Sequence, residues 1–457
     1  PKRSELCHFL DVARLLWGEV FGTGFCTTGV VPRHGPGATA EGVSGNGKFA
    51  HAVWTDRLES TFPLTDHLFA SLNQIDCDEH GLCKVTVLSP QDELPVRVIQ
   101  VPKTLKTPRT IAIEPVCMQY TQQAVARWVM KMIQTSRYTR DSIRFNDQST
   151  NRLLALQGSS DGSVSTIDLS DASDRIPYSI VRQMLAGCPD LWDAIDACRS
   201  RSARLPDNSV IELRKFASMG SALCFPVESM FFYTIVVHAI MEKYNLPLTL
   251  ANIVNASRGL HIFGDDIIVP KGETDTAIRA LSRFYCKVNS SKSFWNGKFR
   301  ESCGMDAYDG TDITPVYVRE PAPRKQRDST GIVSWISTSN QFHLAGMWKT
   351  ADYMKNVVES RLGSLPVVLD TSPGLGWTSF LGIPKYERMC RNTHVCLVKT
   401  YKVKARRVSD PLDGYPALLK YFLRVENQKI DSTLRPLTTD KKHLASSARC
   451  GTVSRKR

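Results

Sequence analysis

Alternation of apolar and polar residues predicts β-structure at several places in the chain. Residues 94–101 alternate as a strand, and residues 110–113 form a second strand beyond a proline-containing loop. A short β-run from Val164 delivers Asp168 at or near its end. The fourth stretch is His261-Ile262-Phe263-Gly264-Asp265-Asp266-Ile267-Ile268-Val269, in which mainly apolar residues flank Gly-Asp-Asp. This pattern predicts a tight hairpin with two acids at its tip.

Helical periodicity alternates with these strands. Cys117 to Ile133 is apolar-periodic, and a further helix is expected from the polar residues after Asp168 to Gly187, despite Pro177. A small-residue loop over 215–223 precedes a long apolar helix that reaches about Lys243, with Pro226 tolerable in its first turn.

The later part of the chain predicts one more segment of helix and strands, followed by a linker and a mainly helical region. A helix is expected from Thr274 or Asp275 to about Cys286, followed by a strand pair over 298–308 with a turn near Asp309-Gly310. Beyond Arg319, a Pro-rich basic stretch reads as a linker into a mostly helical last third. With 457 residues the chain is long enough for two to four subdomains.

The two acids of the predicted hairpin need an explanation, because adjacent carboxylates repel each other. The tip is therefore interpreted as a divalent-metal site that lacks at least one further carboxylate. Asp168, at the end of another strand, would face the tip if the two strands are neighbours in one sheet. A solvated Asp-Asp turn is the alternative for the tripeptide taken alone.

The charge and the cysteine content restrict the class of binding partner and the cellular compartment that are expected. The net charge is +13, and residues 401–457 carry fourteen Lys/Arg against five Asp/Glu. This balance favours a polyanionic partner such as nucleic acid. Thirteen cysteines without a framework indicate reduced thiols in a cytosol-like compartment. The sequence shows no membrane span, and no signal peptide is expected at its start.

Two loops have the composition of a nucleotide site. Pro102-Lys103-Thr104-Leu105-Lys106-Thr107-Pro108-Arg109 places three cations on a proline-stiffened loop between strands, which suits a polyphosphate. The loop Ser218-Met219-Gly220-Ser221 has small side chains that let a sugar or base approach the backbone. Each loop also has a plain alternative, a solvated basic loop for the first and a helix entry for the second.

Taken in order, these blocks resemble the motifs of viral RNA-directed RNA polymerases over roughly residues 90–320. The basic loop resembles the nucleotide-entry motif, Asp168 with Asp174 the first palm motif, and Ser218-Met219-Gly220 the second. The GDD motif Gly264-Asp265-Asp266 resembles the third, Lys292 the fourth, and the turn from Phe299 to Gly304 the fifth. The residues of these motifs resemble those of the branch that contains RNA phages, narnaviruses and ourmia-like viruses. The segment from Met219 to Pro226 looks closest to ourmia-like (botourmiavirus) polymerases.

The resemblance implies an α+β right-hand fold, with fingers at 1–160, a palm with an antiparallel sheet at 161–320, and a thumb at 321–457. It implies nucleotidyl transfer from NTPs with two Mg²⁺ ions, for which Mn²⁺ is a substitute. The implied metal ligands are Asp168, Asp265 and Asp266, with Lys292 as proton donor to pyrophosphate and Lys287 as its alternate. The triphosphate would be held by Lys103, Lys106 and Arg109, and the ribose by Ser173, Asp174, Ser218, Gly220 and Ser221.

The expected function is replication of a positive-strand RNA virus genome in the host cell cytoplasm, with RNA template, product duplex and NTPs as partners. Host proteins are a further class of partner that no residue pattern indicates. Two alternatives stay open: a reverse transcriptase-like palm polymerase, and a non-catalytic RNA-binding palm protein. The small, polar Ser170-Asp171-Ala172-Ser173-Asp174 disfavours a reverse transcriptase, which usually has a bulky residue there.

Overall fold

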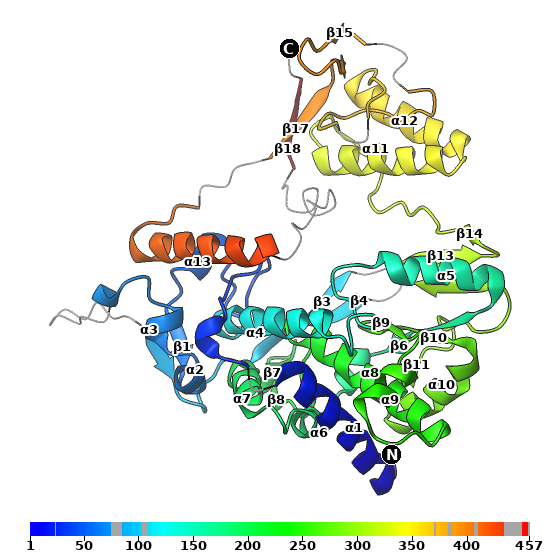
Figure 1. Cartoon of the computed structure of the whole chain (residues 1–457). Helices are drawn as coiled ribbons and strands as arrows, with labels where there is room; N and C mark the ends of the chain where they lie inside the picture. Colours follow the sequence, from blue (N-terminus) through cyan, green and yellow to red (C-terminus); the bar gives the residue numbers. More distant parts are fainter. Residues whose placement is uncertain are drawn as a thin grey trace. The chain divides into compact units, whose positions relative to one another are not determined.

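The structure is a computed structural model that describes residues 1–22, 24–74, 85–102, 108–369, 372–382, 386–405, 410–433 and 450–455 (Figure 1). The chain divides into two compact units, one formed by residues 1–314 with 410–433 and the other by 315–409 with 434–457. Helices mix with mostly antiparallel sheets, so the expected α+β class is confirmed. The boundaries of fingers, palm and thumb stay a prediction.

The first unit contains these described helices: α1 Arg3–Phe21, α2 Asp56–Thr61, α3 Leu64–His67, α4 Val116–Thr135, α5 Ser149–Asp161, α6 Tyr178–Met184, α7 Pro189–Cys198, α8 Cys224–Lys243, α9 Leu250–Ala256, α10 Thr274–Arg283 and α13 Gly414–Thr433. Its strands are β1 Val53–Thr55, β2 Thr86–Leu88, β3 Val96–Pro102, β4 Pro108–Ile113, β5 Val164–Ile167, β6 Leu169–Ser170, β7 Ser202–Arg204, β8 Val210–Glu212, β9 His261–Phe263, β10 Asp266–Pro270, β11 Lys287–Val288, β12 Phe299–Ser302, β13 Met305–Tyr308 and β14 Thr311–Asp312. The expected helices at 117–133, 224–243 and 274–286 are confirmed, the last ending three residues early.

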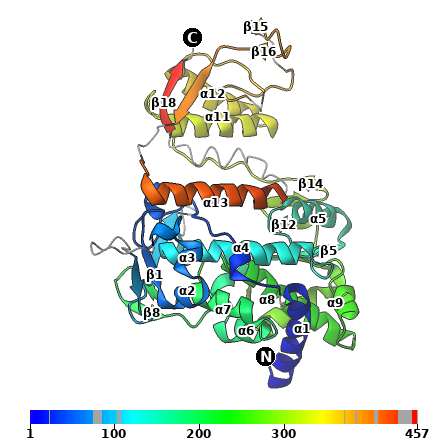
Figure 2. The same ribbon diagram turned by 60° about the vertical axis from the view of Figure 1, so that its left-hand side comes forward.

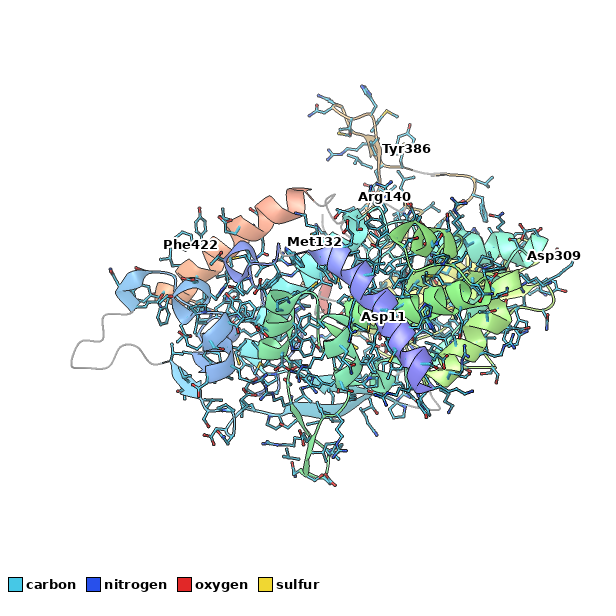
Figure 3. The ribbon with its side chains drawn as sticks, turned by 60° about the horizontal axis from the view of Figure 1, so that its bottom comes forward. Asp11, Met132, Arg140, Asp309, Tyr386 and Phe422 are labelled. Carbon is cyan, nitrogen blue, oxygen red and sulfur yellow. The ribbon has the colours of Figure 1, made fainter. Side chains whose placement is uncertain are left out.

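Helix α8 forms the centre of the first unit. Almost every side chain from Cys224 to Met241 is buried, so the helix is apolar on all sides. Helix α1 packs across it, and Trp17 Nε1 donates a hydrogen bond to Thr234 Oγ1 at 3.0 Å. Figure 3 shows α1, marked by Asp11, running over the green helices of this core. Among the described residues α8 is the one helix apolar and long enough to cross a membrane, but 94% of that window is buried inside the fold.

A three-stranded antiparallel sheet, in the order β5-β10-β9, lies against α8 and α10. Ile267 pairs with Ile167 on one side and with Ile262 on the other. The expected hairpin and its neighbouring strand are therefore confirmed. Figure 1 shows β9 and β10 grouped with α8, α9 and α10.

One local expectation was wrong, and a second was confirmed but incomplete. The helix predicted after Asp168 is broken: a 3₁₀ turn at Ala172–Arg175 is followed by α6, which begins after Pro177. Proline lacks a backbone N–H and fits the start of a helix better than its interior. The strand pair predicted over 298–308 is confirmed, with its own turn at Cys303-Gly304. The predicted turn at Asp309-Gly310 is also present, and it leads to a third strand that was not predicted. All four turn residues have positive φ, which favours a two-residue hairpin turn.

A second sheet, in the order β4-β3-β7-β8, carries the strands that flank the predicted basic loop. The outer edge of β4 is hydrogen-bonded to a segment outside the sheet: the backbone N–H of Ala112 donates to the carbonyl of Met219 at 2.8 Å. The small-residue loop and the basic-loop strand are thus hydrogen-bonded to each other.

The last third is only partly helical, which corrects the sequence-based expectation. The second unit contains α11 Ser329–Leu344, α12 Trp348–Leu362, β15 Arg388–Met389, β16 Cys396–Leu397, β17 Tyr401–Ala405 and β18 Cys450–Arg455. Helix α13 belongs instead to the first unit, where Lys420 Nζ donates to Asn46 Oδ1 at 2.6 Å and Asn427 Nδ2 to the Pro32 carbonyl at 3.3 Å (Figure 2).

Candidate active site

The hairpin between β9 and β10 is closed by Gly264 and Asp265. Phe263 pairs with Asp266, and Gly264 has φ +65°, as the first central residue of a two-residue turn requires. A Cβ at Gly264 would collide with the Phe225 ring and lie 2.9 Å from Glu228 Oε1. Both the backbone angle and the space therefore require glycine, and the turn leaves Asp265 exposed.

Asp168 lies directly beyond the β5 ladder. Continuing the register of Ile167 with Ile267 by one residue places Asp168 across from Asp266. Opposite residues in an antiparallel pair project from the same face. The acids predicted to meet, Asp168, Asp265 and Asp266, are therefore brought together at one end of the sheet.

Hydrogen bonds hold Asp168 in place. Asn289 Nδ2 donates to Asp168 Oδ2 at 2.9 Å, and the Asn289 backbone N–H donates to the Asp168 carbonyl at 2.9 Å. Ser293 Oγ accepts from the backbone N–H of Asp168 at 3.0 Å. Both partners follow β11, which pairs with β6 next to Asp168. Asn289 and Ser293 could not be predicted from the sequence, because only the β6–β11 pairing brings them to Asp168.

The cluster of acids is electrostatically strained. Burial, and then the charge of Asp265, raise the pKa of Asp266 to about 6, although the Cys303 N–H donates to its Oδ2 at 3.1 Å. Burial and the charge of Asp265 also raise the pKa of Asp168, against the Asn289 hydrogen bond. A cation placed among these carboxylates would relieve this repulsion.

Lys292 is the cation that borders the cluster. Burial lowers its pKa, but the charges of Glu301, Asp168 and Asp266 outweigh burial and raise it. Its Nζ forms an ion pair with Glu301 Oε1 at 3.2 Å. Lys292 is thus protonated and stands close to the acids. Lys287, the alternate, lies on β11 with its side chain exposed.

The donor set fits a hard divalent cation. Three carboxylates offer oxygen ligands, which Mg²⁺ and Mn²⁺ prefer. Within the described part of the chain, however, no three acidic, histidine or cysteine side chains stand close enough to enclose a metal ion unaided. Mg²⁺ commonly takes one or two carboxylates together with water and substrate phosphates, so a closed protein cage is not needed.

The predicted triphosphate residues are only partly described. Arg109 is on β4, exposed and paired with Val101 of β3. Lys103 and Lys106 lie outside the described residues. The predicted strand-loop-strand arrangement is confirmed at both flanks of this loop.

The predicted ribose residues gather at the entry to α8. Ser218 is buried, and Gly220 has φ +135°, where a Cβ would collide with the carbonyl of Ala112. Ser173 is buried and its side chain hydrogen-bonds Cys224, while Asp174 forms an ion pair with Lys215. Ser221 Oγ contacts Gln122 Oε1 at 3.0 Å. Lys215 and Gln122 were not identified from the sequence.

Glu228 is a further acid that the sequence analysis missed. It is buried on α8, behind the Gly264 turn, and burial followed by the charge of Asp265 raises its pKa to about 8. Cys224 Sγ lies 3.8 Å from Glu228 Oε2. One charged residue inside an otherwise apolar helix was the signal that could have identified it.

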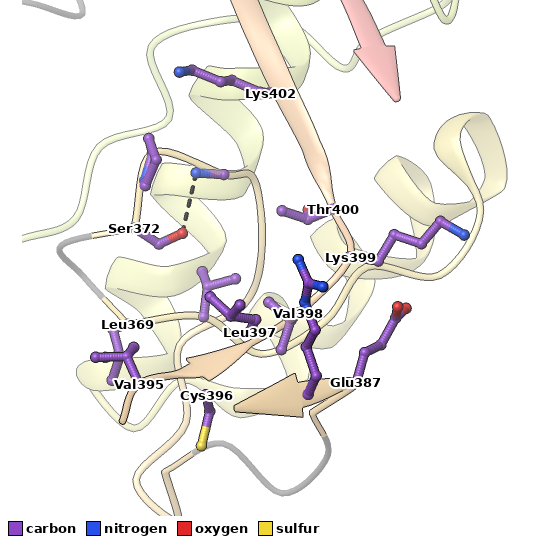
Figure 4. A pocket seen from close by; sticks show the side chains of 14 residues that line it. Leu369, Ser372, Glu387, Val395, Cys396, Leu397, Val398, Lys399, Thr400 and Lys402 are labelled. Carbon is purple, nitrogen blue, oxygen red and sulfur yellow. Dashed lines mark hydrogen bonds between the residues drawn. The ribbon is translucent and has the colours of Figure 1, made fainter. Parts of the chain in front are cut away.

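A large cavity in the second unit has no part in this cluster. It measures about 970 Å³ and contains none of the predicted site residues. Figure 4 shows its lining, including Leu369, Glu387, Leu397, Lys399 and Lys402.

Known proteins resemble this chain over the same region. The family model "RNA replicase, beta-chain" matches residues 84–348, more than half of the chain. The RNA-directed RNA polymerase beta chain of Escherichia phage MS2 is 37% identical over 49% of this chain and 38% of its own length. The corresponding subunit of Qbeta virus (strain MX1) is 33% identical over 49% of this chain and 35% of its own length. The match thus spans less than two fifths of each relative.

Two solved structures show weaker likeness. The RNA-dependent RNA polymerase of a human picorbirnavirus matches with TM-score 0.38 and 14% identity over 59% of this chain and 57% of that chain. The BmCPV RNA-dependent RNA polymerase at elongation state matches with TM-score 0.42 and 11% identity over 78% of this chain and 33% of that chain. On the evidence of the family model, and not of these likenesses, the chain belongs to the RNA replicase beta-chain family.

Proposed function

We propose that this chain is an RNA-directed RNA polymerase that copies the genome of a positive-strand RNA virus. The observation that carries the proposal is the meeting of Asp168 with Asp265 and Asp266 at one end of the β5-β10-β9 sheet. The membership of residues 84–348 in a replicase family supports it. The right-hand arrangement of fingers, palm and thumb is part of the same proposal.

The substrates follow from this function: an RNA template with its product duplex, and NTPs. Two Mg²⁺ ions, held by Asp168, Asp265 and Asp266, would activate the attacking 3′-hydroxyl and neutralise the leaving pyrophosphate. Arg109 binds triphosphate oxygens, together with Lys103 and Lys106. Lys292, kept protonated by Glu301 and the nearby aspartates, delivers a proton to pyrophosphate.

The ribose is recognised at the base of α8. The wall of the ribose site is formed by Ser173, Ser218, Gly220 and Ser221. Asp174 also binds the sugar, after giving up its ion pair with Lys215. A wall that hydrogen-bonds the 2′-hydroxyl rejects dNTPs, because a deoxy substrate leaves its polar groups unpaired.

The direct test is extension of a primed RNA template by purified protein, with Asp265→Ala, Asp168→Asn and, as matched control, Asp275→Asn. Asp275 is an exposed acid on α10, outside the strands and the turn that carry Asp168, Asp265 and Asp266. Wild type and the control should incorporate NTPs, both active-site variants should lose at least about a thousandfold, and chelation of Mg²⁺ should abolish synthesis. Normal synthesis by a folded Asp265→Ala protein would refute the assignment.

Two other functions are separated by the same assay. A reverse transcriptase-like enzyme would incorporate dNTPs as well as NTPs on the RNA template. A non-catalytic RNA-binding palm protein would bind the template but extend nothing, with or without Mg²⁺.

The proposal has two further parts: the chain belongs to the ourmia-like branch, and it acts in the host cell cytoplasm. The second motif supports the branch, since Met219-Gly220-Ser221-Ala222 departs from the Met-Gly-Asn-Gly typical of phage replicases. A phylogeny that groups residues 84–348 with phage sequences instead would remove that placement.

A further inference from the structure

Gln122, on α4, is completely buried and touches the loop that leads into α8. Its Oε1 accepts from the Ala222 backbone N–H at 3.1 Å and contacts Ser221 Oγ at 3.0 Å. Its Nε2 donates to the Cys198 carbonyl at 2.8 Å, and its side chain also hydrogen-bonds the carboxyl of Glu114. A single amide thus joins α4, α7, the end of β4 and the 218–222 loop.

These partners fix the orientation of the amide. The Ala222 N–H can only donate and the Cys198 carbonyl can only accept, so the oxygen of Gln122 faces the loop and its nitrogen faces α7. An amide oxygen can only accept, and therefore the Ser221 hydroxyl must point its hydrogen at Gln122. The Leu223 backbone N–H, 3.3 Å from Ser221 Oγ, takes up one lone pair of the same hydroxyl.

The Ser221 hydroxyl is consequently left with one free lone pair and no free hydrogen. Such a group pairs with a hydrogen-bond donor, and the 2′-hydroxyl of a ribose is one. A deoxyribose offers no donor at this position and leaves the lone pair unsatisfied.

We propose that Gln122 is the positioning residue that makes Ser221 an obligate acceptor and thereby sets the preference for ribonucleotides. This inference rests on the proposed polymerase function. Gln122 does not touch the nucleotide; it acts through Ser221, and its hydrogen bond from the Ala222 backbone N–H fixes the orientation of the amide.

The test compares NTP with dNTP incorporation, as a ratio of kcat/KM, in wild type, Gln122→Met and Gln123→Met. Methionine has a similar length but no amide, so Gln122→Met leaves the Ser221 hydroxyl free to rotate. Gln123 is the next residue of the same helix, half-buried, and forms no hydrogen bond with residues 218–222, so its variant is the matched control. The NTP preference should fall roughly tenfold to a hundredfold in Gln122→Met and stay unchanged in Gln123→Met.

A double-mutant cycle with Ser221→Ala separates positioning from general damage. If Gln122 acts through Ser221, the Gln122→Met/Ser221→Ala protein has the preference of Ser221→Ala alone. Gln122→Glu, whose protonated carboxyl can both accept and donate, should restore most of the preference. Additive effects of the two substitutions, or an unchanged ratio in Gln122→Met, would overturn the inference.

The same experiment distinguishes failure of the proposed function from failure of the role assigned to Gln122. A wild-type protein that extends no primer overturns the proposed function, and the role of Gln122 falls with it. A wild-type protein that extends primers, with a Gln122→Met ratio equal to that of wild type, overturns only the role of Gln122.

Discussion

At the residue scale, the candidate site depends on positions where one side chain, or its absence, is required. The sequence predicted Asp168, Asp265 and Asp266 because acids at strand ends are a visible pattern. It did not predict Gln122, Asn289 or Glu301, since a polar residue on a helix or loop has many solvated alternatives. Only the packing of α4, β11 and β12 brings these residues to the acids and to the 218–222 loop.

Gly264→Ala tests the requirement at the hairpin tip. The left-handed backbone and the collision with Phe225 and Glu228 should cost about 1–3 kcal/mol and shift Asp265. A misplacement of about 1 Å can cost a hundredfold in rate, so primer extension should fall by at least that factor. Thermal unfolding and extension rates measure both effects.

Gly162→Ala is the control for this substitution. Gly162 also has a left-handed φ, +67°, but a Cβ there meets nothing within 4 Å. It should lose about 1 kcal/mol of stability and keep its extension rate. Equal activity losses in the two variants would mean that the space at the tip is unimportant.

Glu114 gives a pH dependence that is independent of the metal site. It is buried at the end of β4, where burial raises its pKa to about 7, although Ser200 and Gln122 hydrogen-bond it. Because the folded pKa exceeds the unfolded one, its contribution to stability is complete below about pH 4.5 and is lost as the pH rises to about 7. Wild type should therefore lose roughly 2–3 kcal/mol more than Glu114→Gln between pH 4.5 and 7.5.

Urea unfolding at a series of pH values measures this difference. Glu212→Gln, an exposed acid on β8, is the control and should follow the wild-type curve. Parallel curves for wild type and Glu114→Gln would show that Glu114 ionises as readily in the fold as in the unfolded chain.

At the scale of elements, the hydrophobic pattern predicted most of what surrounds the site. Residues 261–270 formed the expected hairpin because Gly264 permits its turn, and α8 formed because Cys224–Lys243 is apolar on every side. The helix expected up to Gly187 was wrong, since Pro177 starts a new helix. The third strand after Asp309-Gly310 was missed because Thr311–Asp312 is short and exposed.

Arg300 links strand β12 to strand β5 through hydrogen bonds. It is completely buried on β12 and donates to the carbonyl of Val164, on the strand that leads to Asp168, at 2.7 Å. It also donates to the carbonyls of Gly297 and Phe299. Arg300→Lys cannot reproduce this fork and should lose about 2–3 kcal/mol in urea unfolding.

Lys298→Met on the same hairpin provides the comparison. Lys298 is exposed and pairs with Asp309 at 2.7 Å, so solvent screens this ion pair and its removal should leave the urea unfolding midpoint almost unchanged. Similar losses for Arg300→Lys and Lys298→Met would contradict a fastening role for Arg300.

At the scale of the whole molecule, the net charge of +13 predicts how the protein would bind RNA in the proposed function. Binding that neutralises several phosphates releases counterions, so affinity falls steeply with salt. The Kd for single-stranded RNA should rise at least about tenfold between 50 and 200 mM salt. Fluorescence anisotropy with a labelled RNA measures this, and a Kd that does not change with salt would contradict phosphate binding.

The whole-molecule division was the least predictable feature. A linker near Arg319 was visible in the sequence, and the second unit does begin at residue 315. The return of α13 to the first unit was not visible, because its contacts with Pro32 and Asn46 join residues nearly four hundred positions apart.

The central claim is that Asp168 and Asp265 act together in template-directed RNA synthesis. The most direct measurement supplies a defined RNA template, one NTP at a time and Mg²⁺, to wild type, Asp168→Asn, Asp265→Asn and the double variant. The account predicts that wild type adds only the complementary NTP, and that each single variant is as inactive as the double variant. Synthesis by any of the three variants at the wild-type rate, or addition of NTPs without regard to the template, would contradict it.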